Sequence, residues 1–152
     1  MSGGGAPKLN IDASDLQVAI VAGSWHNEVM EGLIAGAERS LKAAGNETFE
    51  LWRVPGAFEL PLAAQKAIDA GAQVVIALGV VIRGATPHFD YVCSAATEGL
   101  TRVQLDSGVP IGFGLLTVDN EQQALDRAGL KGSIEDKGAE AVEAAVLMAH
   151  LA

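Results

Sequence analysis

A chain of 152 residues that is 49% hydrophobic has the size and apolar content of one globular domain, which argues against an intrinsically disordered protein. Its formal net charge of −9 disfavours nucleic acid and anionic membranes as partners, and no apolar run approaches the roughly 18 residues that span a bilayer. The single cysteine, Cys93, cannot form an intrachain disulfide, so a reducing cytoplasm is the expected compartment. In its apolar helical stretch, Cys93 fits a buried structural thiol better than a nucleophile.

The first elements expected along the chain are a flexible start, a strand and a helix. Residues 1–14 are Gly-rich and lack the apolar region of a signal peptide, so a mobile segment is predicted there. The run 16–23 is apolar and rich in β-branched residues, which predicts a buried strand. Apolar residues at helical spacing predict a helix over 28–44, ended by Gly45, and a second strand is expected over 47–54.

Two further strand–helix pairs and a last helix follow. Pro61 suits the first turn of a helix that extends to about residue 70. Residues 72–82 form the most apolar run, predicted as a central strand, and a long helix is expected over 89–107. The fourth strand is predicted over 111–118, Asn120 suits the N-cap of a short helix to residue 128, and an Ala-rich helix is expected over 137–151. Apolar strands that alternate with helices predict an α/β fold with a four-stranded parallel sheet covered by helices on both sides.

Polar and aromatic side chains gather where the predicted strands end, which is where ligands bind in parallel α/β sheets. They comprise Ser24, Trp25 and His26 after the first strand, Gly56 to Glu59 after the second, Arg83 to His88 after the third, and Thr117 and Asp119 after the fourth. Most have an ordinary alternative role: Trp25 as a cover for the sheet edge, Glu59 as a helix-dipole partner, and Thr86 or His88 as a helix cap. Arg83 alone fits best as an ordinary surface or interface residue, and Arg127 and Lys137 can be structural groups near helix ends.

The stretch RGATPH, residues 83–88, makes the strongest joint case for a ligand site. A glycine, a hydroxyl and the backbone amides at a helix start can hold a phosphate without a basic surface. One nearby arginine could add a bidentate clamp, and a charge-assisted hydrogen bond is worth about 1.5–3 kcal/mol. The histidine of this stretch, His88, is of the residue type suited to proton transfer near neutral pH.

Motifs for several other chemistries are absent from the sequence. It contains no Walker A motif, no G-x-G-x-x-G and no G-x-S-x-G, which weakens the case for ATP- or NAD-dependent chemistry. The three histidines lie far apart and lack cysteine partners, so no metal site is expected.

The stretch GVVIRGATPHFDYVC, with PGAFELP before it and ALDRAG and EDKG after it, resembles the 6,7-dimethyl-8-ribityllumazine synthase family from about residue 16 onward. The resemblance implies a flavodoxin-like three-layer α/β/α sandwich over a single domain of residues 15–152. It also implies the penultimate reaction of riboflavin biosynthesis. In that reaction, the amine of 5-amino-6-(D-ribitylamino)uracil condenses with the ketone of 3,4-dihydroxy-2-butanone 4-phosphate through an imine, releasing phosphate and water. No cofactor and no metal is implied.

The resemblance also implies roles for individual residues. His88 matches the proton-transfer residue, and Trp25 matches the aromatic that stacks on the pyrimidine. The other matched positions are Ala57, Phe58 and Glu59 at the ribityl chain, Val80, Val81 and Ile82 at the ring and side chain, Gly84, Ala85, Thr86 and Arg127 at the phosphate, Lys137 beside the site, and Phe113 from the adjacent subunit. Trp25 stands where many members carry Phe, and position 113 varies among relatives.

The assembly implied by the resemblance is a homopentamer with active sites at subunit interfaces. Segment 129–138 is slightly longer than in shell-forming members, so an icosahedral shell is less expected. The resemblance further implies a functional association with riboflavin synthase. Two alternatives use the same strand ends: a carrier of a flavin or a phosphorylated metabolite, and a pure shell or scaffold protein. A carrier has no use for His88 beside Arg127, and a scaffold predicts neither residue.

Overall fold

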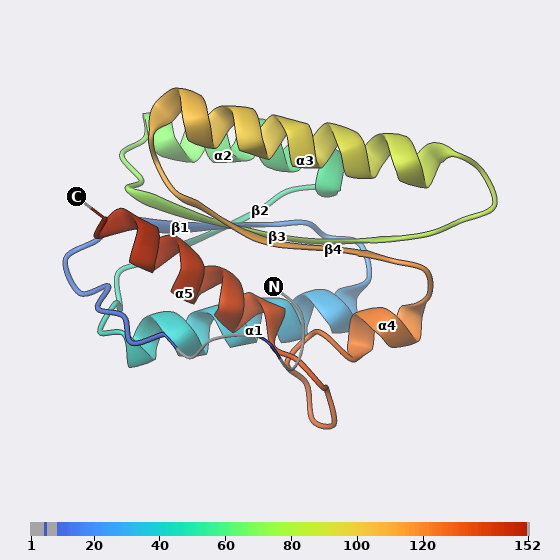
Figure 1. Cartoon of the computed structure of the whole chain (residues 1–152), viewed down its shortest axis with the longest axis horizontal. Helices are drawn as coiled ribbons and strands as arrows, with labels where there is room; N and C mark the ends of the chain where they lie inside the picture. The colour runs from blue at the N-terminus through green and yellow to red at the C-terminus, as the bar shows by residue number, and fades with distance from the viewer. Residues whose placement is uncertain (1–4, 6–8, 152) are drawn as a thin grey trace.

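The computed structural model describes residue 5 and residues 9–151, which form a parallel sheet between two helical layers (Figure 1). The elements in chain order are β1 (Val18–Ala22), α1 (Asn27–Ala43), β2 (Glu50–Arg53), the 3-10 turn η2 (Ala57–Glu59), α2 (Leu60–Asp69), β3 (Val74–Ile82), α3 (His88–Ser107), β4 (Ile111–Val118), α4 (Glu121–Leu125) and α5 (Lys137–Ala149). Of the flexible segment predicted over 1–14, residues 1–4 and 6–8 lie outside the described ones. Its last residues, from Ile11, pack against the core, where Ala13 is fully buried.

The four strands lie in the order β2-β1-β3-β4 and all neighbours are parallel, which confirms the predicted α/β class. Helices α2 and α3 cover one face of the sheet, and α1, α4 and α5 lie on the other (Figure 1). The chain moves outward from β1 to β2 and then crosses back to β3, so the strand order reverses between β1 and β3. In open parallel sheets, ligands bind beyond the carboxyl ends of the strands at this reversal.

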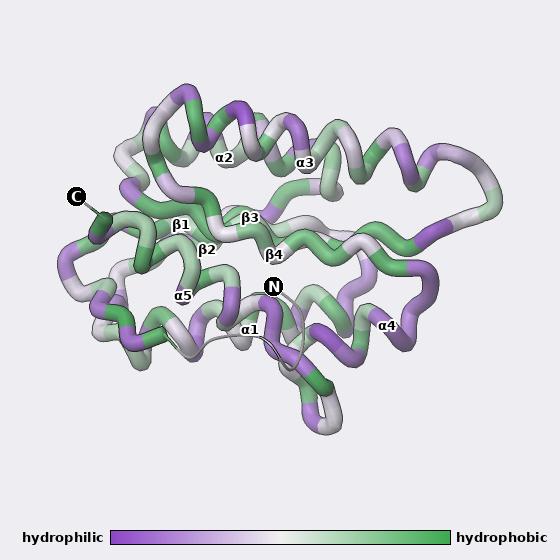
Figure 2. Tube along the Cα trace, in the orientation of Figure 1, coloured by the Kyte–Doolittle hydropathy of each residue, from purple (hydrophilic) through white to green (hydrophobic). Residues whose placement is uncertain are grey.

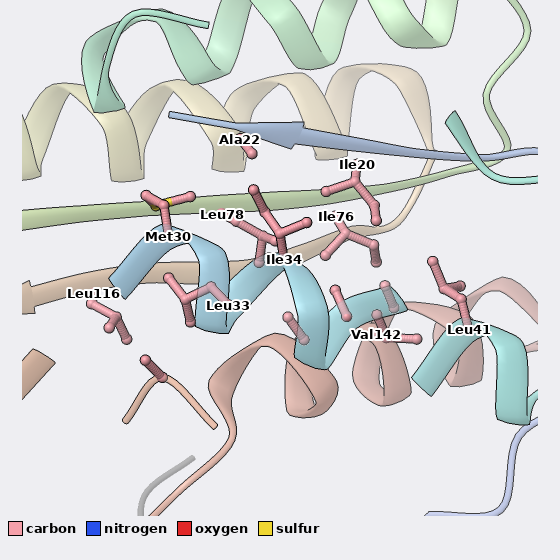
Figure 3. Packing of buried hydrophobic residues seen from close by; sticks show 14 of the residues in the cluster. Ile20, Ala22, Met30, Leu33, Ile34, Leu41, Ile76, Leu78, Leu116 and Val142 are labelled. Atoms are coloured by element: carbon pink, nitrogen blue, oxygen red, sulfur yellow. The ribbon is translucent and has the colours of Figure 1, made fainter. Parts of the chain in front are cut away.

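The core explains why the strands are apolar throughout. Along β3, Val74, Ile76 and Leu78 pack with α1 and α5, whereas Val75 and Ala77 pack with α2 and α3. This alternation follows from the two-residue period of a strand, and both faces are buried because both carry helices. Figure 3 shows the cluster on the α1 and α5 side of the sheet, which includes Ile20 and Ile76 of the strands, Leu33 of α1 and Val142 of α5. The hydropathy colouring of Figure 2 is accordingly apolar along the middle of the sheet.

Most predicted helix ends are confirmed by their capping groups. The Asn120 side chain accepts a hydrogen bond from the Gln123 N–H at 2.9 Å, which starts α4. Pro61 lies in the first turn of α2, and Gly45 adopts a left-handed conformation (φ 87°) two residues after the end of α1. Within the described residues, no helix combines the length and apolar character needed to cross a bilayer.

Five predicted elements are shorter in the structure. Strand β1 covers 18–22 instead of 16–23, β3 covers 74–82 instead of 72–82, and α5 ends at Ala149 instead of 151. Strand β2 covers Glu50–Arg53 instead of 47–54, because it is an edge strand that pairs only with the five-residue β1. Helix α4 ends at Leu125 instead of 128, since the chain tightens there: the Arg127 N–H bonds to the Ala124 carbonyl, and Gly129 then turns with φ 65°.

Candidate active site

The loops that follow β1 and β2 meet around Gly56. The Ser24 hydroxyl of the first loop donates to the Val54 carbonyl of the second at 2.7 Å. A side-chain carbon on Gly56 would lie 3.1 Å from Cδ1 of Trp25 and 3.5 Å from Oε1 of Glu59. The absence of a side chain at Gly56 thus lets the indole of Trp25 and the carboxylate of Glu59 lie close together. Trp25 is expected to stack on the pyrimidine ring, and Glu59 to bind the ribityl chain.

Aromatic surface is exposed at this end of the sheet. Trp25 is 68% exposed and Phe58 is 64% exposed. Trp25 is followed by His26 in a left-handed conformation (φ 60°), a backbone state that costs a non-glycine residue about 1–3 kcal/mol. The rings of Trp25 and His26 lie with centroids 6.4 Å apart and planes tilted by 46°. A flat heterocycle would find an apolar platform here.

The segment between β3 and α3 forms an open loop at a helix start. Residues 83–88 are all exposed, and no described atom lies within 4 Å of the position that a Gly84 side-chain carbon would take. The Thr86 hydroxyl accepts a hydrogen bond from the His88 N–H at 3.4 Å, and His88 is the first residue of the 20-residue helix α3. The loop therefore has the exposed backbone and the helix dipole that anion binding uses.

Arg83 has a more defined position than the sequence suggested. Its Nε lies 2.9 Å from Oδ1 of Asp119, and its Nη1 lies 3.5 Å from Oδ1 of Asp90. The guanidinium carbon lies 4.4 Å from the ring centre of Phe89. The hydrogen bond to Asp119 is the main cause that raises the pKa of Arg83, with Asp90 adding to it. Arg83 is exposed, as expected of a surface residue, and its contacts join the ends of β3 and β4 to the start of α3.

A signal for this contact exists in the sheet register. Ile82 pairs with Val118, so the residues that follow them, Arg83 and Asp119, lie opposite each other. Opposite charges directly across neighbouring strands attract. Sequence reasoning missed the pair because it considered each strand end separately.

Arg127 and Lys137 lie next to each other at the far end of the α4 segment. The Lys137 N–H donates to the Arg127 carbonyl at 3.0 Å, and Arg127 Nη1 donates to the Gln123 carbonyl at 2.9 Å. The Lys137 ammonium lies 2.6 Å from Oε2 of Glu135 and 3.3 Å from Oε1 of Glu140. Burial opposes its charge, but the two carboxylates outweigh burial and raise the pKa of Lys137. The positive charge of Lys137 is thus largely compensated, whereas the guanidinium of Arg127 donates to a neutral carbonyl.

The remaining predicted residues lie at different depths along the sheet. Val80 is buried, and Val81 and Ile82 are half-buried at the end of β3, beside the loop that follows it. Phe113 is 50% exposed on the edge strand β4, five positions before its last residue, Val118. At about 3.3 Å per residue, Phe113 lies roughly 16 Å from that strand end. Within one chain, Phe113 therefore does not join the strand-end group.

Two surface hollows lie away from the strand ends. One, of about 470 Å³, separates α2 from α3 and is lined by residues such as Leu62 and Val103. The other, of about 200 Å³, lies at the amino ends of β1 and β2, beside Glu50 and Trp52. Among the described residues, no group of three or more His, Cys, Asp or Glu side chains could hold a metal ion. At the strand ends themselves, residues 83–88 and the side chains of Trp25 and Phe58 are exposed.

The strand order and the strand-end side chains define a flavodoxin-like α/β protein with its candidate site at the carboxyl edge of the sheet. Residues 15–152 match the family model described as 6,7-dimethyl-8-ribityllumazine synthase, and the chain belongs to this family.

Curated relatives named 6,7-dimethyl-8-ribityllumazine synthase match nearly the whole chain. The protein of Kineococcus radiotolerans is 64% identical over 96% of this chain and 91% of its own length. That of Leifsonia xyli subsp. xyli is 62% identical over 98% of this chain and 95% of its own, and that of Streptomyces coelicolor is 56% identical over 98% and 93%. The predicted family, fold and enzyme class are confirmed: the chain is a transferase of riboflavin biosynthesis.

Proposed function

We propose that the chain joins 5-amino-6-(D-ribitylamino)uracil to 3,4-dihydroxy-2-butanone 4-phosphate at the carboxyl edge of its sheet, releasing phosphate and water. The observation that carries this proposal is the gathering of unlike groups at one edge. An aromatic platform and an acceptor carboxylate follow β1 and β2, and an open glycine loop at a helix start follows β3. The first two suit a ring with a sugar-alcohol chain, and the third suits a phosphate.

The pyrimidine is proposed to stack on Trp25, with Phe58 and Ala57 beside its ribityl chain. Glu59 accepts a hydrogen bond from a ribityl hydroxyl. The close approach of Trp25 and Glu59 around Gly56 supports this arrangement, because one substrate can reach both side chains. The end of β3, Val80 to Ile82, supplies apolar contacts to the ring and side chain.

The phosphate is proposed to bind the backbone of Gly84, Ala85 and Thr86, with Arg127 as the charged clamp. We call these four residues the phosphate site. In a chain with a net charge of −9, the partial positive charge of a helix start and one arginine give a local attraction for an anion. Lys137 is proposed as a nearby basic residue whose positive charge is partly neutralised by Glu135 and Glu140.

His88 is proposed as the group that moves protons during the condensation. The amine attacks the ketone, water leaves to form an imine, phosphate is eliminated, and the ring closes with loss of a second water. Each stage needs a proton delivered or removed, which an imidazole does well near neutral pH. His88 follows the phosphate site by two residues and is exposed at the start of α3, which suits this role. Holding the two substrates together supplies much of the remaining rate.

The active form is proposed to be a homopentamer in which Phe113 of one chain completes the site of its neighbour. Phe113 is half exposed on an edge strand and lies five residues before the carboxyl end of that strand, which favours a role at another chain's site. Large apolar side chains are also exposed on α2 and α3, namely Leu62, Tyr91 and Leu105. Such single apolar side chains are common on protein surfaces, so they are compatible with a subunit interface but do not carry the proposal. An icosahedral shell is less expected, and a cytoplasmic location and a functional association with riboflavin synthase complete the proposal.

Product formation tests the proposed function. Purified protein is mixed with both substrates, and the fluorescence of the lumazine product is followed, with each substrate alone as the control. We expect product only with both substrates. A folded protein that gives no product would reject the proposal.

A further inference from the structure

Three residues outside the proposed binding set connect the two parts of the phosphate site: Arg83, Asp119 and Gln123. Arg83 directly precedes Gly84, and its Nε donates to Oδ1 of Asp119 at 2.9 Å. The Asp119 N–H donates to Oε1 of Gln123 at 2.7 Å. The Gln123 carbonyl in turn accepts from Nη1 of Arg127 at 2.9 Å. A continuous series of hydrogen bonds therefore runs from the glycine loop to the arginine clamp.

We propose that Arg83 is a positioning residue for the phosphate site, acting on Arg127 through Asp119 and Gln123. This inference rests on the proposed function, since it assumes that residues 84–86 and Arg127 bind one phosphate.

Arg83 also holds both ends of the glycine loop. Its N–H donates to the Val118 carbonyl at 2.9 Å, which fixes the end of β3 against β4. Its guanidinium contacts Asp90 at 3.5 Å and lies 4.4 Å from the Phe89 ring centre, both in the first turn of α3. Residues 84–88 thus span two points that Arg83 holds, one through its backbone and one through its side chain. Fixing the ends of so short a segment restricts the directions of its backbone amides.

A direct phosphate contact by Arg83 is the less favoured role. Two carboxylates, those of Asp119 and Asp90, already compensate its charge, and the Phe89 ring lies against its guanidinium carbon. The planar guanidinium can bond to two carboxylates in fixed directions, which an ammonium group cannot do. Its geometry, more than its charge, is therefore the property that the site uses.

The same chain of contacts sets the position of Arg127. The Asn120 side chain caps α4 by accepting from the Gln123 N–H at 2.9 Å, so the Gln123 backbone is held from its own helix start. The Gln123 side chain ties this helix start to Asp119, and Asp119 is tied to Arg83. Loss of the two guanidinium contacts of Arg83, with Asp119 and Asp90, would let α4 and the Arg127 guanidinium shift relative to the glycine loop.

Arg83→Lys tests this role because it keeps the positive charge and removes the planar guanidinium that contacts two carboxylates. We measure the KM for each substrate, kcat, the affinity for inorganic phosphate by calorimetry, and the mass in solution. Arg102→Lys is the matched control, since Arg102 also pairs with an aspartate, Asp106, but far from the site. We expect Arg83→Lys to weaken phosphate affinity and raise the KM of the butanone phosphate about tenfold, with the pyrimidine KM within twofold. Arg102→Lys should behave like the unchanged protein.

Asp119→Asn provides a second variant at an exposed partner of Arg83. Asp119→Asn should also weaken phosphate affinity. The double variant should bind phosphate as well as Arg83→Lys alone does, because both changes break the same connection. Unchanged phosphate affinity in Arg83→Lys, equal effects on both substrates, or effects of the two variants that multiply would each overturn the inference. Suppose that the unchanged protein is active and that Arg127→Ala loses phosphate affinity. An unchanged phosphate affinity in Arg83→Lys would then reject this inference and leave the proposed function standing. If the unchanged protein forms no product, the proposed function fails and the inference with it.

Discussion

The indole of Trp25 lies against the backbone of Gly56, so closely that a side-chain carbon at position 56 would be 3.1 Å from Cδ1 of the ring. The two residues come from different strand ends, and Oε1 of Glu59 lies 3.5 Å from the same point. Gly56 has an extended backbone (φ −157°, ψ −169°) that alanine can also adopt. The need for glycine at this position therefore comes from the neighbouring ring, not from the local backbone.

Gly56→Ala should displace the indole and weaken binding of the pyrimidine. Loss of an aromatic stacking contact of roughly 0.5–1.5 kcal/mol corresponds to a rise of about three- to tenfold in the pyrimidine KM. Because Trp25 is 68% exposed and can move, we expect a small change in melting temperature. Steady-state kinetics with each substrate varied in turn make the measurement. Gly84→Ala is the comparison, since it should change mainly the KM of the butanone phosphate. An unchanged pyrimidine KM in Gly56→Ala would contradict the proposed stacking role of Trp25.

Arg127→Ala should raise the KM of the butanone phosphate far more than that of the pyrimidine. A charge-assisted hydrogen bond of about 1.5–3 kcal/mol corresponds to a loss of roughly ten- to a hundredfold in affinity. Lys131→Ala, at an exposed lysine of the following loop, is the control and should leave both constants unchanged. Equal effects of Arg127→Ala on both substrates would remove Arg127 from the phosphate site.

His88→Ala should slow the condensation on the order of a hundredfold, the lower range for general acid–base catalysis, while pyrimidine affinity is largely kept. Single-turnover fluorescence measures the rate, and equilibrium titration measures the affinity. His150→Ala changes a histidine at the end of α5 and serves as the control. An unchanged rate in His88→Ala at every pH would show that another group transfers the protons.

Glu143→Gln should stabilise the fold at neutral pH. Burial, followed by the nearby carboxylates of Glu140 and Asp136, raises the pKa of Glu143 above its ordinary value of 4.5. A raised carboxyl pKa means that the charged form is disfavoured in the folded state, so stability is lost as the pH rises through the folded pKa. We expect a melting temperature about 1–2 °C higher at pH 7, and no difference below pH 4.5. Glu140→Gln removes a partner of Lys137 and should have the opposite sign; a stabilisation by Glu143→Gln that persists at low pH would exclude the charge as its cause.

The elements that sequence predicts well are those whose limits are set locally. Strand β4 begins and ends at the predicted residues 111 and 118, because Pro110 and Asp119 bound its apolar run. β2 was predicted too long, since its limits depend on how much of β1 is available for pairing. No local pattern reports the length of a neighbouring strand.

The candidate site likewise has one part that the sequence predicts and another that depends on the fold. The segment 83–88 was recognisable because its residues are adjacent in sequence and have the composition of an anion loop. The contact of Arg83 with Asp119 and the contact of Trp25 with Gly56 join residues about 30 positions apart, and they follow only from the strand order and register. The position of Phe113 relative to a site depends on another chain, which neither sequence spacing nor a single chain specifies.

The most direct test of the account is a crystal structure of the assembled protein with a pyrimidine substrate analogue and inorganic phosphate. We predict the ring against Trp25, the phosphate on residues 84–86 and Arg127, and the imidazole of His88 between the two ligands, with Phe113 of a neighbouring chain at the same crevice. Ring and phosphate in separate cavities, with His88 and Arg127 on different ones, would contradict the account.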